Sequence, residues 1–265
     1  MPLPPLVEPV AELSAQERAR TARHAALAGL GPVGQRRLAA ARVGVVGAGG
    51  LGSPALLALA AAGIGELVLV DDDEVDLSNL HRQVIHGVGD VGRPKVDSAA
   101  ESIAAVSPET RVRAVTTRID AENAVELLRG CHVVLDGSDA FETRTAVAAA
   151  CATLGVPLVW GTVQEWHAQL TVFWSAPPNG REPVVLADLH DPAEVGEPPA
   201  CSAVGVLGAL CMQVGSLMAA EAVKLIAGAG EPLLGRVLLI DGLRSRVREV
   251  ALRGAAPAAP TTPQP

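Results

Sequence analysis

Aromatic residues are almost absent from this sequence of 265 residues, which has no tyrosine, two phenylalanines and three tryptophans. Because 49% of the residues are nevertheless hydrophobic, the core must consist of aliphatic side chains and alanine, which suits close packing of helices on a sheet. Charged residues amount to only 19%, well short of a disordered composition. The composition predicts a folded protein with a sizeable core, as one large domain or two small ones.

Basic runs and closely spaced cysteines are also missing. With 21 Lys and Arg against 29 Asp and Glu, the formal net charge is -8, which argues against nucleic-acid and anionic-membrane partners. The four cysteines form no CxxC pair, so no zinc is expected, and they are too sparse for a disulfide framework, so a cytoplasmic location is predicted. The N-terminus lacks the basic segment of a signal peptide. The apolar run at 203–220 barely reaches transmembrane length and predicts a buried helix instead.

Strands and helices alternate regularly in the first two thirds of the chain. A β-branched run at 42–46 is followed by a glycine turn at 47–52, an apolar helix at 53–62 and a second strand at 66–70. This order is a βαβ unit and implies a parallel sheet. Further helices are expected at 95–106, 122–128 and 144–154, and further strands at 111–119, 132–136 and 157–160. We therefore predict an α/β fold with a Rossmann-like, doubly wound, mostly parallel sheet.

The remaining parts of the chain have different sequence patterns. Runs at 168–174, 236–241 and 246–252 predict a C-terminal antiparallel extension, with a buried helix at 206–226. At the other end, Ser14 and Glu17 have the spacing of a capping box and predict a helix reaching about residue 28. The expected organisation is a flexible leader at 1–12, one folded domain at 13–252 and a disordered tail at 253–265.

The glycine turn has the spacing GxGxxG, formed by Gly47, Gly49 and Gly52. Glycine lets a phosphate approach the backbone, and the following helix offers unpaired N–H groups and the positive end of its dipole. Asp71 ends the next strand, where a carboxylate can accept hydrogen bonds from a ribose. The pattern indicates an adenine nucleotide but does not separate ATP from NAD, and a tight turn without a ligand is the alternative.

Polar residues after the second and fourth strands favour a triphosphate. Arg82 and Lys95 are isolated cations in an acidic chain, and both follow the second strand, close to the sheet edge where such folds bind ligands. Fixed cations stabilise the charge that develops in nucleotidyl transfer. Asp139, just beyond the fourth strand, is the candidate for Mg²⁺. Asp136 is expected instead to cap the following helix or to accept a loop hydrogen bond.

These motifs follow one family in order along the chain. The segments at 47–54, 70–83, 91–95, 135–139, 168–173 and 215–228 resemble those of the E1-like activating enzymes of the ThiF/MoeB/HesA type. LSNLHRQ at 77–83, with the glycine loop and GRPK at 92–95, is highly specific. The resemblance covers about residues 13 to 252. It is closest to the zinc-free MoeB/MoeZ-like adenylyltransferases without a rhodanese domain, because both CxxC pairs found in many members are missing.

The resemblance implies adenylation with ATP and Mg²⁺ of the C-terminal glycine of a small ubiquitin-like sulfur-carrier protein of the MoaD or ThiS kind. This step prepares a Gly-Gly-ended carrier for thiocarboxylate formation in molybdopterin, thiamin or related biosynthesis, with sulfur from a separate donor. One alternative is a catalytically weak E1-like scaffold, because Thr21 and Ala140 replace the usual Tyr and Asn. The other is an NAD-dependent oxidoreductase, against which LSNLHRQ argues strongly.

The family's functional residues carry over to matching positions. Arg23 matches an arginine that reaches the ATP of the other subunit, so a homodimer is expected. Cys201 matches a cysteine that forms a covalent link in sulfur-transfer members, whereas the other three cysteines are expected in the core. The expected catalytic residues are Arg82, Arg23, Asp139 and Cys201. The expected nucleotide-binding residues are Gly47, Gly49, Gly50, Gly52, Asp71, Ser78, Asn79, Arg82, Gln83, Lys95 and Asp139, of which Asp139 also binds Mg²⁺.

Overall fold

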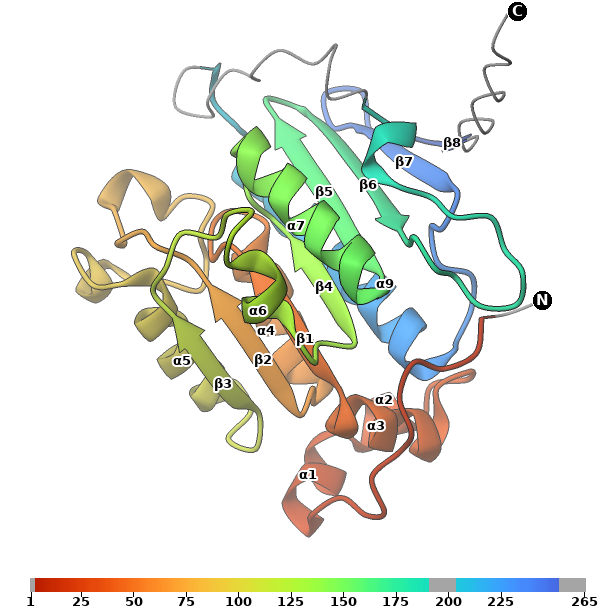
Figure 1. The fold of residues 1–265 in the computed structure, drawn as a ribbon. Coiled ribbons are helices and arrows are strands. Elements are labelled where there is room, and N and C mark those ends of the chain that lie inside the picture. The colour runs from red at the N-terminus through yellow and green to blue at the C-terminus, as the bar shows by residue number, and fades with distance from the viewer. Residues whose placement is uncertain (1–2, 191–203, 253–265) are drawn as a thin grey trace, which may run out of the picture.

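The computed structural model describes residues 3–190 and 204–252, and it contains one sheet of eight strands in the order β3-β2-β1-β4-β5-β6-β7-β8 (Figure 1). The strands are β1 (Arg42–Val46), β2 (Glu66–Val70), β3 (Arg111–Val115), β4 (Val133–Asp136), β5 (Leu158–Gln164), β6 (His167–Phe173), β7 (Arg236–Asp241) and β8 (Arg246–Ala251). The first five are parallel, and β6 to β8 are antiparallel. The predicted fold class, including the antiparallel extension, is confirmed.

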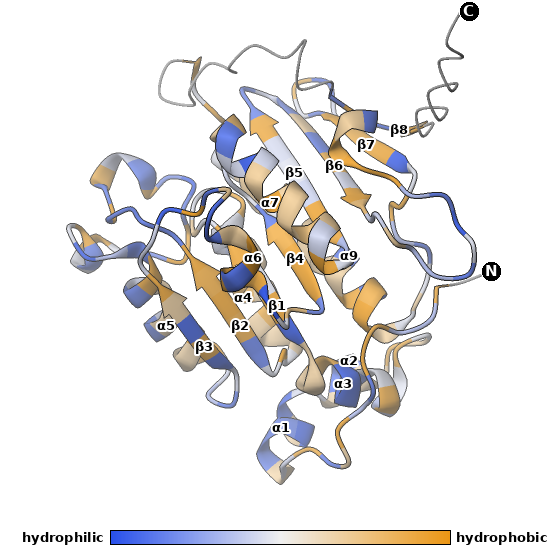
Figure 2. Ribbon diagram, viewed as in Figure 1, coloured by the Kyte–Doolittle hydropathy of each residue, from blue (hydrophilic) through white to orange (hydrophobic). Residues whose placement is uncertain are grey.

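Helices cover both faces of the parallel strands. On one face lie α3 (Gly31–Ala40), α4 (Gly52–Ala62), α5 (Lys95–Val106) and α9 (Gly208–Ala227), and on the other lie α6 (Ala124–Leu128) and α7 (Phe141–Leu154). Short 3₁₀ turns are η1 (Leu77–Asn79), η2 (Val88–Asp90) and η3 (Leu186–Asp188). Because both faces are covered, the central strands are almost continuous apolar runs, which Figure 2 shows in orange.

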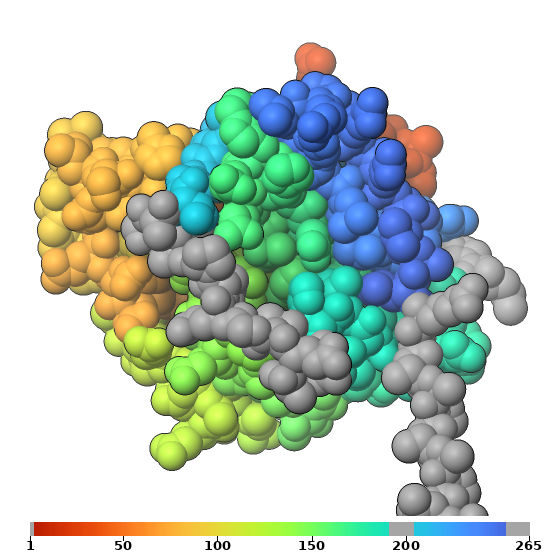
Figure 3. All heavy atoms as spheres, turned by 90° about the horizontal axis from the view of Figure 1, so that it is seen from above, coloured from red at the N-terminus to blue at the C-terminus, as the bar shows by residue number. Residues whose placement is uncertain are grey.

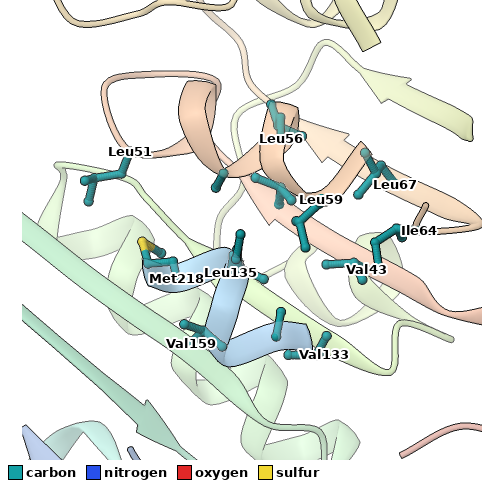
Figure 4. Packing of buried hydrophobic residues seen from close by; sticks show 14 of the residues in the cluster. Val43, Leu51, Leu56, Leu59, Ile64, Leu67, Val133, Leu135, Val159 and Met218 are labelled. Carbon is teal, nitrogen blue, oxygen red and sulfur yellow. The ribbon is translucent and has the colours of Figure 1, made fainter. Parts of the chain in front are cut away.

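The main core lies between α4, α9 and the sheet (Figure 4). Leu56 and Leu59 of α4 are wholly buried, and Leu59 lies next to Val43 of β1. Met218 of α9 approaches the same core beside Leu135 of β4. Aliphatic side chains therefore make most of this interface, as the scarcity of aromatic residues predicts.

Helix α9 satisfies the length and hydropathy expected of a membrane-spanning segment, the one helix among the described residues that does. It nevertheless packs against α4, β5 and β6. Its inward-facing residues, including Val214, Met218 and Ala222, are buried in the core. The predicted buried helix is confirmed.

The N-terminal region differs from the expectation of one helix to about residue 28. It contains α1 (Ala15–Arg20) and α2 (Ala22–Ala25), separated at Thr21, whose hydroxyl donates to the carbonyl of Glu17 at 2.7 Å. The capping box is half formed: the Ser14 hydroxyl accepts from the Glu17 N–H at 3.0 Å, but the Glu17 carboxylate accepts from Arg20. Helix α3, which was not predicted, begins at Gly31, has Pro32 in its first turn and packs on α9.

Other boundaries also shift. Strand β3 ends at Val115 rather than at 119, β5 continues beyond Trp160, and α7 begins three residues earlier than expected. Residues 3–12, expected as a flexible leader, pack on the domain: Leu3 and Val7 are buried, and the N–H of Leu6 donates to a carbonyl of α9 at 3.3 Å. The tail predicted at 253–265 lies outside the described residues.

Candidate functional site

A cavity opens at the carboxyl ends of β1 and β4, which are neighbours in the sheet. The glycine loop after β1 leads to α4 on one face, whereas the segment after β4 leads to α7 on the other face. The chain direction therefore diverges here, which is where open α/β sheets leave a crevice. The cavity measures about 290 Å³. Figure 3 views the molecule from this end, with the segment near residue 80 in orange and that near residue 165 in green.

The glycine loop is held tightly against its surroundings. Gly47 has a φ of 87°, a left-handed conformation that favours glycine. A Cβ atom on Gly52 would lie 1.7 Å from the carbonyl oxygen of Gly47, so this position also requires glycine. The N–H of Ala48 donates to Asp71 Oδ2 at 2.7 Å, and its carbonyl accepts from the Ser53 hydroxyl at 2.9 Å. These contacts fix the conformation of the glycine loop.

Asp71 ends β2 and links the glycine loop to the segment that follows. Its second carboxylate oxygen accepts from the N–H of Asp73 at 2.8 Å. Burial raises the pKa of Asp71, while the nearby Lys95 and the two backbone hydrogen bonds oppose the shift. Among the described residues each oxygen accepts one hydrogen bond and keeps a second lone pair, so the carboxylate can still accept from a ribose hydroxyl.

The two predicted cations lie beside the cavity with partners. Lys95 is buried, and its Nζ lies 2.7 Å from Oδ2 of the exposed Asp73. Arg82 donates from Nη2 to Asn79 Oδ1 at 2.6 Å, so Asn79 orients a cavity cation and does not itself line the cavity. Gln83 lines the cavity, and its buried Oε1 has no hydrogen-bond partner among the described residues. These groups can neutralise and bind an anion.

Two carboxylates follow β4. Asp136 is wholly buried, and its Oδ1 accepts from the Ser138 N–H at 2.9 Å, one of the two roles that the sequence suggested. Burial raises its pKa, and its Oδ2 has no partner in the described part of the chain. Asp139 is exposed and lines the cavity. It is the accessible carboxylate of the pair.

Most of the expected nucleotide-binding residues meet around this cavity. Those that line it are Gly47, Gly49, Gly50, Asp71, Arg82, Gln83, Lys95 and Asp139. Gly52 lies behind Gly47, and Asn79 acts through Arg82. Ser78 is exposed and bonds Asp76 instead. Cys201 lies outside the described residues.

Arg23 is not brought to the cavity of its own chain. It is exposed on α2, and the adjoining α1 contacts the C-terminal end of α4, where Arg20 donates to the Ala61 carbonyl at 2.8 Å. The cavity lies at the opposite, N-terminal end of α4. A role for Arg23 in a nucleotide site therefore requires a second chain.

Several residues that line the cavity were not predicted from the sequence. Cys211 is buried, as expected, yet it lines the cavity, and its Sγ lies 3.2 Å from where a Cβ on Gly50 would be. Thr162 and Arg144 also line it. The continuation of β5 as GTVQ was the available signal for Thr162, whereas a single arginine early in a helix gives no comparable signal. The remaining described cysteines are core residues, and burial raises the pKa of Cys131 to about 11.

Comparison with known proteins fits this geometry. A model of the ThiF family matches residues 21–261. This coverage shows that the chain belongs to the ThiF family, and the E1-like resemblance drawn from its motifs is confirmed.

Among its relatives, the chain is 50% identical over 252 residues to the probable adenylyltransferase/sulfurtransferase MoeZ of Mycobacterium tuberculosis, covering 95% of this chain and 64% of that protein. It is 44% identical over 239 residues to the sulfur carrier protein adenylyltransferase of Thermus thermophilus, covering 90% and 88%. The chain thus spans somewhat less than two thirds of MoeZ. The E. coli MccB structure with MccA-N7isoASN has a TM-score of 0.78 at 21% identity, covering 93% of this chain and 74% of MccB, and supports the fold.

Proposed function

We propose that this chain uses ATP and Mg²⁺ to adenylate the C-terminal glycine of a small ubiquitin-like sulfur carrier. The observation that carries the proposal is the cavity at the β1/β4 switch point, where a glycine loop, Arg82, Lys95 and Asp139 converge. The names of the MoeZ and Thermus thermophilus relatives support it. The product is a carrier activated for thiocarboxylate formation, in molybdopterin, thiamin or related sulfur-transfer biosynthesis.

The nucleotide is proposed to lie across the cavity, with its ribose near Asp71 and its phosphates over the glycine loop. Close approach of backbone N–H groups at 47–50 suits an anion. Lys95 is held at the cavity by the exposed Asp73 at 2.7 Å. A phosphate oxygen can replace that carboxylate while the ammonium stays paired, so the ion pair keeps Lys95 in place for the nucleotide.

The residues after β4 fit Mg²⁺. This ion prefers carboxylate oxygens together with phosphate oxygens and water, and Asp139 offers an exposed carboxylate at the cavity. The carboxyl of Asp136, three residues earlier, is wholly buried, and its Oδ2 has no hydrogen-bond partner among the described residues. When bound, Mg²⁺ withdraws charge from phosphate oxygens. Asp139 is the residue proposed to hold it, and no zinc is expected.

The proposed reaction needs no side-chain base. The carrier's C-terminal carboxylate, already an anion, attacks the α-phosphorus of ATP, and the bond to the β-phosphate oxygen breaks. Pyrophosphate leaves, and an acyl-adenylate remains on the carrier. Arg82 and Lys95 stabilise the charge on the phosphates, so orientation and electrostatics supply the acceleration. A sulfur nucleophile from a separate donor then displaces AMP, directly or through Cys201.

A homodimer in the cytoplasm is proposed as the working form. Arg23 is exposed and distant from its own cavity, which suits a contribution to the partner's site. Leu77 and Val88, on the segment that carries Arg82, are 64% and 73% exposed. Exposed apolar side chains beside a functional segment are typical of a surface that another chain covers. No nucleic acid or membrane partner is proposed.

Carrier-dependent ATP–pyrophosphate exchange tests the function. We expect Mg²⁺-dependent exchange with one member of a panel of Gly-Gly-ended MoaD- and ThiS-like proteins, and none when its last glycine is deleted. Arg82→Ala should abolish exchange, whereas Arg129→Ala, at an exposed position just after α6, should not. Normal exchange by Arg82→Ala would remove Arg82 from the mechanism.

The same experiment separates the alternatives. Carrier binding without exchange would favour a scaffold, an alternative that Ala140 supports because it lines the cavity where the family has Asn. In that case Ala140→Asn is the first reversion to test. Tight NAD(H) binding without pyrophosphate chemistry would favour an oxidoreductase.

A further inference from the structure

Arg144 joins three segments around the cavity. It lies in the first turn of α7, and its Nε and Nη2 both donate to the carbonyl oxygen of Ser138, at 3.1 and 2.8 Å. Nη2 also donates to Thr162 Oγ1 on β5, at 3.1 Å. One guanidinium therefore ties the segment after β4 to the beginning of α7 and to the neighbouring strand.

The Arg144 guanidinium is also held in place by packing on an aromatic ring. Its central carbon lies 5.6 Å from the centroid of the Trp160 ring, within the range of a cation–π contact. Trp160 is 1% exposed, so the surface beneath the guanidinium is fixed by the core. The buried Asp136 carboxyl is close enough for the positive charge of Arg144 to oppose the rise in its pKa. Packing and charge both hold Arg144 in one place.

Both the N–H and the carbonyl oxygen of Ser138 are hydrogen-bonded. Its N–H donates to Asp136 Oδ1 at 2.9 Å, and its carbonyl oxygen accepts from Arg144. That carbonyl belongs to the planar peptide unit that ends at the Cα of Asp139, so fixing the oxygen restricts where Asp139 begins. Asp139 makes no hydrogen bond or ion pair with residues 3–190 or 204–252. Its backbone therefore determines where the carboxylate can lie.

We propose that Arg144 is a positioning residue for metal binding: it holds the Ser138–Asp139 peptide so that the Asp139 carboxylate faces the nucleotide's metal ion. This inference rests on the proposed function. Arg144 touches neither the metal nor the reacting phosphorus in this role. Outer partners of a metal ligand typically change metal affinity about 10–100-fold when they are removed.

Metal binding measures this role apart from catalysis. The probe is Mn²⁺, whose free form is counted by electron paramagnetic resonance, titrated into the full chain with α,β-methylene ATP. The affinity for the analogue without metal is measured separately. Arg144→Met is expected to weaken Mn²⁺ binding about tenfold and to change metal-free nucleotide affinity less than about twofold. Arg144→Lys, which can still reach one carbonyl, should fall between this variant and the wild type.

Three further variants complete the design. Thr162→Val removes one hydrogen-bond acceptor of Arg144 and leaves the arginine in place. It should therefore weaken Mn²⁺ binding by a smaller factor than Arg144→Met does. This variant also tests the proposal if Arg144→Met fails to fold. Arg129→Met replaces an exposed arginine just after α6 and should have no effect. Adding Arg144→Met to Asp139→Ala should cause no further loss, because Arg144 acts through Asp139.

The outcomes are distinct. Unchanged Mn²⁺ affinity in a folded Arg144→Met variant overturns the proposal, as does an equal loss of metal-free nucleotide affinity, which would indicate collapse of the whole cavity. A further loss on the Asp139→Ala background also overturns it, because Arg144 would then act independently. A wild-type chain that binds no analogue, with or without metal, would contradict the proposed function instead.

Discussion

Gly52 gives the sharpest residue-scale prediction because its Cα faces the Gly47 carbonyl oxygen. Gly52→Ala would place a Cβ 1.7 Å from that oxygen, so the loop must move. We expect a loss of about 1–3 kcal/mol in the free energy of unfolding, measured by urea denaturation, together with weakened ATP binding, measured by calorimetry. Gly89→Ala is the control, since nothing lies within 4 Å of its added Cβ. Equal affinities for the two variants would mean that the loop does not hold the phosphates.

His86 gives a pH-dependent prediction. It is buried, and its ring nitrogens lie 2.8 Å from the Ser98 hydroxyl and 3.2 Å from the Ala48 carbonyl. Burial lowers its pKa below the ordinary 6.5. As the pH falls below about 6.5, His86 binds a proton in the unfolded chain but stays neutral in the folded chain. The free energy of unfolding therefore decreases from that pH down to the pKa of His86 in the folded chain.

This effect is isolated by comparing the wild type with His86→Gln. The slope of unfolding free energy against pH, between pH 7 and 5, should be steeper in the wild type by up to about 1.4 kcal/mol per pH unit, the limit for one proton. Urea denaturation at each pH provides the measurement. Parallel slopes would show that His86 binds its proton equally in both states.

At the scale of elements, side chains from other helices cap the C-terminal end of α4. Gln35 of α3 is wholly buried, and its Nε2 donates to the Ala62 carbonyl at 2.7 Å while its Oε1 contacts His24 at 2.8 Å. Gln35→Ala removes the side-chain donor to this half-buried carbonyl and should cost about 1–3 kcal/mol of unfolding free energy. The exposed Gln16→Ala should change it by less than about 0.5 kcal/mol. A fully stable Gln35→Ala variant would mean that water replaces the cap.

The same region shows what local patterns predict and what they miss. Strands β1 and β2 were predicted with their observed bounds because their β-branched runs are bordered by glycine and acidic residues. Helix α3 was missed because three of its stabilising features are tertiary: the buried Gln35, the contact with α9 and the packed segment 3–12. The break at Thr21 depends on a side-chain hydrogen bond to the preceding turn, which periodicity does not reveal.

The residues of the candidate site also fall into those that the sequence predicted and those that it did not. The glycine loop, Asp71, Arg82 and Lys95 were found because each follows the first or the second strand of one βαβ unit, and both strands end at the same sheet edge. Arg144 and Cys211 were missed as cavity residues because α7 and α9 bring them there from distant parts of the chain. Motif spacing predicts what one unit carries, whereas contributions from other elements require the packed structure.

At the scale of the whole molecule, Arg23 and the cavity lie at opposite ends of α4. If each cavity receives Arg23 from the partner chain, two variants that are inactive alone can form a hybrid dimer that has activity. In a hybrid dimer of Arg23→Ala with Arg82→Ala chains, the Arg23→Ala chain keeps its own Arg82 and receives Arg23 from its partner. The other site lacks both arginines. A symmetric dimer therefore predicts one working site in each hybrid.

Co-expressed variants test this arrangement by carrier-dependent ATP–pyrophosphate exchange. Each variant alone should be inactive, and random pairing makes half of the dimers hybrids with one working site of two, so about a quarter of the wild-type activity should return. Arg18→Ala, at an exposed position on the preceding helix α1, should retain activity on its own. A mixture no more active than its separate components would place Arg23 outside the partner's site. Full activity of Arg23→Ala alone would exclude it from the reaction, because a cation that stabilises transferred phosphate charge cannot be removed without cost.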